Sequence, residues 1–451
     1  MYSFMKAGVS KSFLAKFLGW IINIANRWIT NSIFYAIGSK LFKAESPTNV
    51  WIKNSLIYSL TGTIYSRIEK LYCELDEKWL YLTEKIQISD TRKILGPYLF
   101  PLMILAYFSI AKTHFSFRTL ISIGLGLASI IIGLKLGSME GVKVKSQLAR
   151  EKTLRIGYLM MVIGYFSLIY ELTSIRGLPL LNEELRRRLL PIPTMLSWTI
   201  VPGTLYVLSS KGVEWVKKFG VSKARFKFLV VSLISLFSVS TLAYRTETVS
   251  LLIGIIIIAY FSDLIRSPEI PAFLAASLFI LVAVTVVRYH ALGLSIGALQ
   301  TIITRDTITT SNYDILVERF GLMSLTSGSI HLSVFSSLFR FLPGPFYSPR
   351  RIMAYLIRGT VTVSMTTTIF GPLILDFGIA GMCLILLIIG YLLSFFFNIA
   401  LSSENLHLLG PYATIFSYLS VSIETGLLDF NVYIYLLISS ILLLKSLERR
   451  I

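Results

Sequence analysis

The chain has 451 residues, of which 54% are hydrophobic and 15% are charged, and its mean hydropathy is +0.71. These values exclude an ordinary water-soluble domain and indicate a polytopic helical membrane protein. The formal net charge of +19 indicates membrane topology and an anionic lipid or substrate rather than a nucleic acid, because the basic residues alternate with apolar runs and no nucleic-acid-binding motif is present.

The first 93 residues are predicted to lie mainly at the cytoplasmic face of the membrane. Residues 13–37 mix Phe, Trp and Ile with asparagines and an arginine, whose side chains are costly inside a bilayer. We therefore interpret 13–37 and 50–66 as amphipathic helices on the inner leaflet. One or two additional spans in this region remain the alternative.

The rest of the chain is predicted to be an all-α polytopic membrane protein with about ten transmembrane helices, or 11–12 under that alternative. The predicted spans are 95–111, 118–136, 155–174, 194–210, 227–243, 247–262, 270–287, 371–398, 407–423 and 430–446. Seven spans lie within 94–287 and three within 371–451, on either side of a long extracytoplasmic segment, 288–370.

The positive-inside rule gives this arrangement one orientation. Residues 137–155 hold five basic and two acidic residues, and residues 211–227 hold six basic and one acidic, so both connections are predicted to be cytoplasmic. Both termini then lie in the cytoplasm as well. The connections predicted to lie outside are 175–193, 244–246, 288–370 and 424–429.

The long outer segment is predicted to be helical. Apolar residues at near-helical spacing indicate one or two interfacial helices within 313–342, and a Pro-Gly-Pro turn at 343–345 ends that pattern. A Ser-Pro pair at 348–349 suits an N-cap and a first helical position, and Gly359 suits a stop. Together they predict a helix over 349–358.

Arginine replaces lysine in this half of the chain. Between Lys227 and Lys445 there are 217 residues with nine arginines and no lysine. Seven of the arginines lie in the outer segment: Arg288, Arg305, Arg319, Arg340, Arg350, Arg351 and Arg358. Guanidinium binds phosphate bidentately, whereas lysine is a hydrated point charge, so the pattern favours a site for an anionic headgroup. Anchoring to the bilayer and compositional drift are the alternatives.

The predicted helix 349–358 carries a candidate diphosphate clamp. Arg351, Tyr355 and Arg358 share one of its faces. Arg350 and Arg351 lie at its N-terminus, where unpaired N–H groups and the helix dipole favour anions. Binding of outer-leaflet lipid phosphates is the alternative.

Two other outer positions combine a cation with a candidate base. Arg245 and Glu247 occupy the turn between the fifth and sixth predicted spans, where an arginine needs a polar cavity or a partner. Arg288 and His290 lie where the seventh span emerges, and an imidazole there can accept a proton from a sugar hydroxyl. The alternatives are snorkelling for Arg245 and a structural role for His290.

Further candidates are charged residues in or beside the outer segments: Arg176, Arg319, Arg350, Asp376, Glu424 and Asp429. Arg176 belongs to a turn that contains Gly and Pro, and Arg319 is expected to pair locally with Glu318. The three carboxylates are either bases or, as we favour, partners that neutralise arginines.

No metal site and no cofactor are predicted. Neither Cys73 nor Cys383 has a His or Cys neighbour at metal-ligand spacing, and there is no phosphate-binding glycine loop. Charged residues within the predicted spans are scarce, which disfavours an ion-coupled transport path.

Several short motifs resemble those of one family in their order and placement. They are Arg176-Gly177-Leu178-Pro179-Leu180, Tyr244-Arg245-Thr246-Glu247, Pro343-Gly344-Pro345, Ser348-Pro349-Arg350-Arg351, Arg358-Gly359, Thr366-Thr367-Thr368, Phe370-Gly371-Pro372, Asp376-Phe377-Gly378-Ile379-Ala380-Gly381 and Ile423-Glu424-Thr425-Gly426-Leu427-Leu428-Asp429. Over residues 155–446 the chain is similar to oligosaccharide repeat-unit polymerases, which are O-antigen-polymerase-like proteins, and most of all to their archaeal branch.

The resemblance implies a GT-C-like membrane glycosyltransferase involved in polysaccharide biosynthesis. It would polymerise lipid-diphosphate-linked oligosaccharide repeat units on the outer face of the plasma membrane. Its partners would be a polyprenyl-diphosphate-linked oligosaccharide, membrane lipids, and flippase and chain-length-regulator proteins. Some bacterial members carry an Arg and a Gly separated by ten residues in outer loops, and no outer arginine here has that spacing.

In the implied reaction an acceptor hydroxyl attacks the anomeric carbon of the donor and a polyprenyl diphosphate leaves. Arginines stabilise the charge of the leaving group, so no metal is required. The predicted clamp is Arg245, Arg288, Arg351 and Arg358, and the predicted base is His290 or Glu247. A flippase for the same lipid-linked saccharides and a ligase that transfers a finished glycan are the alternatives.

Overall fold

The computed structural model describes residues 66–77, 96–138, 146–266, 269–291, 298–339, 344–345, 347–402 and 406–447. The chain forms two compact units, Met1–Glu74 and Leu75–Ile451. Almost all of the first unit, including the predicted inner-leaflet helices, lies outside the described residues. The second unit carries the predicted spans and candidate site residues.

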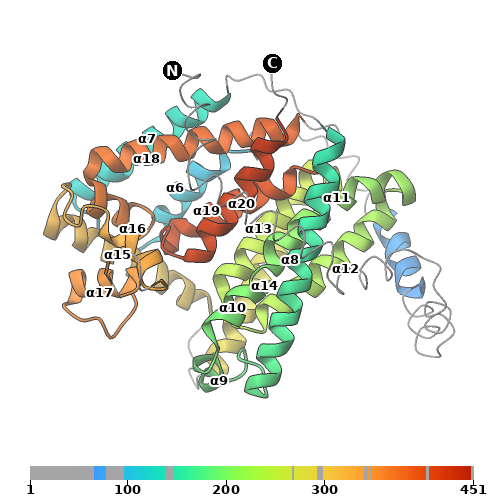
Figure 1. Cartoon of the computed structure of the whole chain (residues 1–451), viewed down its shortest axis with the longest axis horizontal. Helices are drawn as coiled ribbons and strands as arrows, with labels where there is room; N and C mark the ends of the chain where they lie inside the picture. The colour runs from blue at the N-terminus through green and yellow to red at the C-terminus, as the bar shows by residue number, and fades with distance from the viewer. Residues whose placement is uncertain are drawn as a thin grey trace. The chain divides into compact units, whose positions relative to one another are not determined.

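In the described residues of the second unit the regular elements named here are α-helices, shown in Figure 1. In chain order they are α6 (Leu99–Ile110), α7 (Phe117–Ser138), α8 (Ser146–Ile175), α9 (Glu183–Arg187), α10 (Pro191–Ser197), α11 (Ile200–Phe219), α12 (Val221–Ser240), α13 (Arg245–Phe261), α14 (Ile270–Ala291), α15 (Ala298–Phe320), α16 (Ser329–Ser336), α17 (Pro349–Arg358), α18 (Phe370–Leu401), α19 (Leu409–Thr425) and α20 (Phe430–Lys445). The predicted all-α class is confirmed.

Four helices of the described part are long and apolar enough to cross a membrane. They are α7, α8 over Arg150–Ile175, α14 over Ile270–Val287, and α18. Each coincides with a predicted span, as expected of apolar runs close to 20 residues long. The helices α6 and α20 are also apolar but shorter.

Two predictions differ from the structure in their boundaries. The predicted span 194–210 is divided between α10 and α11, since the chain leaves regular helix between Ser197 and Ile200. The predicted interfacial helices within 313–342 are the end of α15 and the separate helix α16.

The helix predicted over 349–358 is α17, which ends at Gly359 with φ +70°. The Ser348 side chain, predicted as its N-cap, forms no capping hydrogen bond.

The helices α7 and α18 pack against each other along their length (Figure 1). Glycines make this possible, because their missing side chains let two backbones approach closely. A Cβ atom at Gly133 would overlap the carbonyl oxygen of Leu387, and one at Gly390 would overlap that of Ile130. By contrast, a Cβ atom at Gly124 of α7 would meet no atom within 4 Å.

The long helix α18 contains a kink at Gly378, which has φ +68°. The break releases backbone groups that bind the segment before α16: Leu325 N donates to Leu375 O at 2.7 Å, and Ile379 N donates to Leu322 O at 2.8 Å. A side chain at Gly378 would be strained by this φ angle and would crowd Ser324 N at 3.1 Å. The kink thus joins the outer segment to the helical core.

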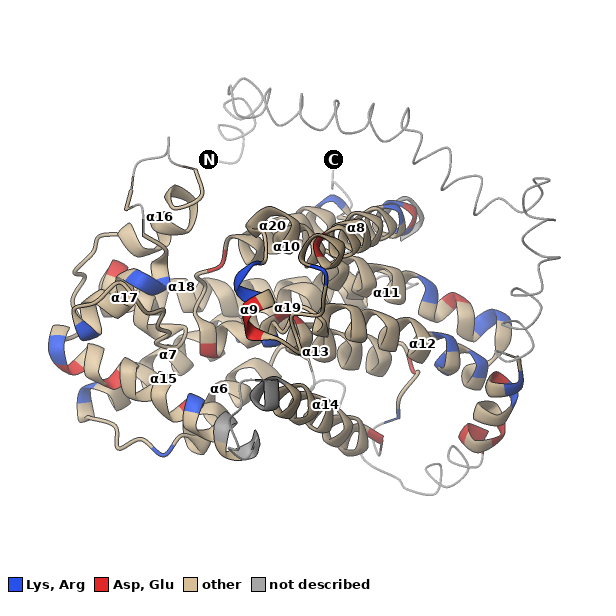
Figure 2. Cartoon of the chain, turned by 90° about the horizontal axis from the view of Figure 1, so that it is seen from below, with Lys and Arg blue, Asp and Glu red and all other residues tan. Residues whose placement is uncertain are grey.

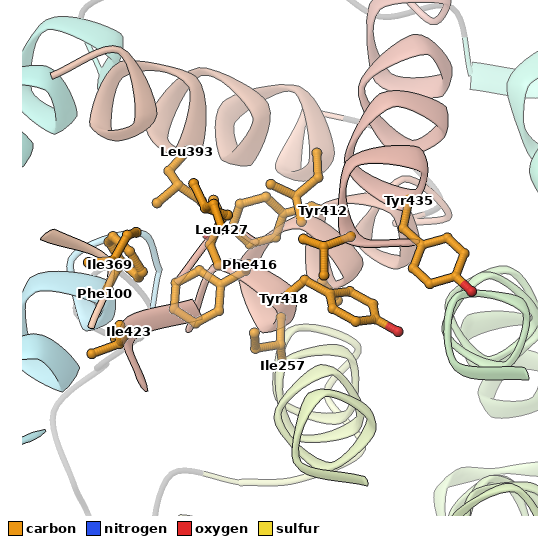
Figure 3. Close-up of a cluster of buried hydrophobic side chains, with 14 of the residues drawn as sticks. Phe100, Ile257, Ile369, Leu393, Tyr412, Phe416, Tyr418, Ile423, Leu427 and Tyr435 are labelled. Carbon is orange, nitrogen blue, oxygen red and sulfur yellow. The ribbon is translucent and has the colours of Figure 1, made fainter. Parts of the chain in front are cut away.

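The helix α19 lies in the middle of the core and is buried on nearly all sides. Figure 3 shows its Tyr412, Phe416 and Tyr418 among side chains from α6, α13, α18 and α20. The Phe416 ring meets Phe100 of α6 edge to face at 6.4 Å, and the Tyr418 ring lies 5.3 Å from that of Tyr435 of α20. This packing fixes the connection that follows α19, residues 426–429.

We predict that Gly133→Ala destabilises the protein and that Gly124→Ala does not. Overpacking at Gly133 should cost about 1–3 kcal/mol, because its neighbour is backbone that cannot move aside. The exposed Gly124 offers open space on the same helix, so the same change should stay within about 0.5 kcal/mol. Melting temperatures of the purified variants in detergent measure both effects, and equal values would contradict this account of the α7–α18 contact.

Candidate functional site

Four segments, counting the end of α19 itself, meet beside the α19–α20 connection. A backbone bond ties the last turn of α19 to the segment before α18, since Ile369 N donates to Ile423 O at 3.1 Å. That segment is bound in turn to α15: Asn312 Nδ2 donates to Thr366 O at 3.3 Å, and Thr309 and Thr366 hydroxyls are 3.1 Å apart. The N-terminus of α13 is the fourth segment. Its Glu247 is bonded to α19 and α20 as described below.

The first pair of charges in this region is Arg305 of α15 and Glu424 of α19. The Arg305 Nε–H donates to a Glu424 carboxylate oxygen, and the two side chains are 43% and 28% exposed. Of the two roles predicted for Glu424, base or arginine partner, the contact present in the structure is the pair with an arginine. Arg305 was counted among the outer arginines but was not part of the predicted clamp.

Asp306 and Arg245 belong to the same group. Burial raises the pKa of Asp306 to about 7, and the charge of Glu424 adds to this increase, while Arg305 and Arg245 oppose it. Arg245 is half-buried at the first position of α13. The group therefore contains two arginines, Arg245 and Arg305, beside a carboxyl group that titrates near neutral pH.

A second arginine–carboxylate pair lies on the other side of the connection. Arg350 Nη2 of α17 donates to Asp429 Oδ2 at 2.5 Å, and both side chains are less than one-third exposed. The Arg350 carbonyl also accepts a hydrogen bond from Met365 N at 3.1 Å. Asp429 is thus the arginine partner predicted from the sequence, and it attaches the N-terminus of α17 to the group. We refer to Arg245, Arg305, Asp306, Arg350, Glu424 and Asp429 as the outer cluster.

Glu247 is held inside the core next to this outer cluster. It is 2% exposed, and it accepts hydrogen bonds from the Tyr418 hydroxyl and from Asn431 Nδ2, the latter at 3.1 Å. These bonds join the beginning of α13 to α19 and α20. The geometry gives Glu247 a positioning role for the turn that carries Arg245.

The predicted face of α17 is exposed as expected. Arg351 and Arg358 are both exposed, and Tyr355 between them is 58% exposed. The opposite face of α17 is buried through Met353 and Ala354. Arg351 therefore lies next to Arg350 at the N-terminus of α17, and Arg358 lies at its C-terminus.

Arg319 and Asp376 have structural partners. Arg319 Nη1 donates to the carbonyls of Leu356 at 2.9 Å and Ile357 at 3.1 Å, which caps the end of α17. Arg319 therefore binds these carbonyls instead of the Glu318 carboxylate that the sequence predicted as its partner. Asp376 is buried, accepts from the backbone N–H of His331 at 2.8 Å, and lies 2.5 Å from His331 Nδ1. Asp376 therefore binds the first turn of α16 and the His331 side chain, and the prediction that it neutralises an arginine is wrong.

The remaining candidates lie apart from these contacts or outside the description. Arg176 is exposed and has φ +52°, just after α8. The Arg186 guanidinium lies 5.8 Å from the Tyr244 ring centroid, next to Arg245 in the sequence. Arg288 and His290 belong to α14, but their side chains lie outside the described residues, so their roles stay predictions.

Neither Asp306 nor His331 is among the site residues predicted from the sequence. Asp306 had one available signal, since it directly follows an arginine within a threonine-rich helix. Within the described ranges, no group of three or more His, Cys, Asp or Glu side chains forms a potential metal site.

The comparisons with known proteins cover this region. Residues 93–436 match a sequence model of the family described as "Putative O-antigen polymerase". An uncharacterized protein of Methanocaldococcus jannaschii is 29% identical over 327 residues, which make up 71% of this chain and 86% of that relative. No solved structure matches the chain. The family match contains every residue of the outer cluster.

We predict that Glu247→Ala lowers the melting temperature, whereas Glu247→Gln largely preserves it. The alanine variant leaves the buried Tyr418 and Asn431 groups without their acceptor, at a cost of about 1–3 kcal/mol. The glutamine retains one carbonyl acceptor in the same place. Thermal unfolding in detergent measures the difference, and an alanine variant as stable as the wild type would rule out the positioning role.

Proposed function

The chain belongs to the O-antigen polymerase family, and on that premise we propose that it is a membrane glycosyltransferase that polymerises lipid-diphosphate-linked oligosaccharide repeat units. The observation that carries the proposal is the outer cluster, in which arginines from three separate segments gather at one end of the helical core. Multiple guanidinium groups on one site suit a diphosphate better than a single lipid phosphate.

The proposed topology has about ten spans with the outer cluster on the extracytoplasmic side. The charge distribution supports it, because two predicted spans separate the lysine-rich connections 137–155 and 211–227. Both connections then lie on the same, cytoplasmic side of the membrane. Some shorter helices then cross where the bilayer is thin or extend into its polar border. Lipid-linked saccharide would reach the site from the outer leaflet.

The proposed reaction is a displacement at the anomeric carbon. The acceptor hydroxyl oxygen forms the new glycosidic bond, the bond to the diphosphate oxygen breaks, and its electron pair leaves with the polyprenyl diphosphate. Arg245, Arg305, Arg351 and Arg358 would stabilise the negative charge of the leaving group without a metal ion. Arg350 would fix the orientation of α17 through Asp429.

The acceptor proton needs a base, and Asp306 is the best placed of the described carboxylates. Its pKa of about 7 means that the ionised form is available at neutral pH and still basic enough to accept a proton. Glu247 is engaged by two hydrogen bonds, which favours Asp306 over it. His290 remains a second candidate from the sequence.

A flippase is the main competing function. It would need cationic side chains along a path through the bilayer. Here Arg245 and Arg350 lie in the first turns of α13 and α17, and Arg305 is a partly exposed residue of α15, which supports chemistry at a surface site. A ligase would use the same diphosphate clamp and differs only in its acceptor.

We predict that Arg351→Ala and Arg358→Ala lower the rate of oligosaccharide elongation by about 10²-fold, the effect of removing one donor to a developing anion. Both side chains are exposed, so the folded protein should accumulate normally. Arg351→Lys should restore little activity, because lysine lacks the bidentate geometry. Elongation in proteoliposomes measures the rate. Arg155→Ala removes an exposed arginine from the connection 137–155, which is predicted to be cytoplasmic, and is the matched control. Wild-type elongation by the Arg351 and Arg358 variants would refute the clamp.

We predict that elongation increases with pH around a midpoint of about 7, as Asp306 loses its proton. Because the Glu424 charge raises the pKa of Asp306, Glu424→Gln should move the midpoint to lower pH. Asp306→Asn should abolish the transition together with most activity. If the midpoint is unchanged in Glu424→Gln, a group other than Asp306 causes the loss of elongation activity at low pH.

A further inference from the structure

A second basic site lies between α8 and the C-terminal half of α11, close to the start of α12. A cavity of about 280 Å³ is lined by Arg150, Ser210, Val213, Glu214, Lys217 and Lys218. Figure 2 shows lysines and arginines gathered at these ends of α11 and α12. The helix α12 separates the cavity from Arg245, which follows its far end, and its 20 residues span about 30 Å. The cavity is therefore distinct from the outer cluster.

An ion-pair network organises one wall of the cavity. Glu214 Oε2 accepts from Arg150 Nη2 at 2.5 Å and from Lys211 Nζ at 2.9 Å. Burial alone would raise the pKa of Glu214, but the hydrogen bond from Lys211 and the charges of Lys211, Arg150 and Lys218 outweigh it and lower the pKa. Glu214 therefore stays ionised and holds the Arg150 guanidinium of α8 against α11.

Among the described residues, the other two cations of the lining are not held in ion pairs. Lys217 and Lys218 are exposed, and within the described structure neither forms an ion pair with a carboxylate. The lining thus contains three cations and one carboxylate. Its net positive charge attracts anions, and the mobile ammonium groups can close on a ligand from the open side.

The lining of the cavity includes a buried residue with an unbonded hydroxyl. Ser210 is 2% exposed, and its hydroxyl has no hydrogen-bond partner. Buried hydroxyl groups are nearly always bonded, so an unbonded one in a cavity wall marks a place for a ligand acceptor. A phosphate oxygen in the cavity would satisfy this donor, and its charge would be attracted by the cations of the lining.

From these features we propose that the cavity binds a phosphate group, carried either by the headgroup of an anionic lipid or by a small soluble phosphate. Its volume lies at the small end of ligand sites and suits a headgroup rather than an oligosaccharide. The connections around it are the lysine-rich ones that the topology assigns to the cytoplasm, where polymerisation does not take place. The site therefore serves a ligand other than the polymerisation substrate.

The test uses the purified full-length protein in detergent. It is titrated separately with inorganic phosphate and with phosphatidylglycerol. Sodium chloride at matched ionic strength is the control for phosphate, and phosphatidylcholine is the control for the lipid. Thermal stability reports binding, because a ligand of the folded state raises the melting temperature. The Lys217→Ala/Lys218→Ala variant should lose at least about tenfold in affinity, and Lys223→Ala, an exposed lysine beyond the lining, should bind as the wild type does.

Ser210→Ala gives an independent measurement. It removes an unbonded hydroxyl, so the unliganded protein should melt no lower than the wild type, while its affinity for phosphate falls. Stabilisation by phosphatidylglycerol alone identifies a lipid site, and stabilisation by inorganic phosphate identifies a soluble ligand; both support the proposal. The proposal is overturned if neither probe stabilises the protein, or if the lysine variant binds as tightly as the wild type. Neither the ligand titrations nor the melting temperatures depend on elongation activity, so this test is independent of the proposed polymerase function.

Discussion

The two carboxylates that flank the α19–α20 connection, Glu424 and Asp429, determine how the outer arginines are arranged. Each binds an arginine from a different part of the outer segment, Arg305 on α15 and Arg350 on α17. Without them, like charges would repel each other at the edge of an apolar core. Because α19 is buried on nearly all sides, the carboxylates lie at the end of a helix that is packed firmly in the core. An arginine has five N–H donors, so one ion pair leaves it able to bind an anionic ligand as well.

The helical architecture could be predicted because its signals are local. Apolar runs near 20 residues marked the long spans, and a Ser-Pro start with a Gly stop marked α17 at both ends. Other boundaries depend on tertiary packing. The kink at Gly378 exists because the segment 322–326 binds the broken helix, and no pattern within α18 announces that partner.

The candidate site was predicted only in part. The common face of Arg351 and Arg358 followed from helical periodicity, and the arginine pairing of Glu424 and Asp429 was one of the two roles that their charge suggested. The specific pairs could not be predicted, since Arg305 and Glu424 are 119 positions apart in the sequence. Asp306 has an elevated pKa only because folding buries it beside Glu424, a cause that a sequence does not contain. The same limit applies to Asp376, whose partners lie on α16.

The central claim is that this protein makes glycosidic bonds between lipid-linked saccharides, and product stoichiometry tests it most directly. Purified wild-type protein would be reconstituted into liposomes with a defined polyprenyl-diphosphate-linked oligosaccharide, and both saccharide length and free polyprenyl diphosphate would be measured. The account predicts a ladder of longer lipid-linked chains, with one polyprenyl diphosphate released for each new linkage. Saccharides that change sides of the membrane but keep their length, with no diphosphate released, would contradict it.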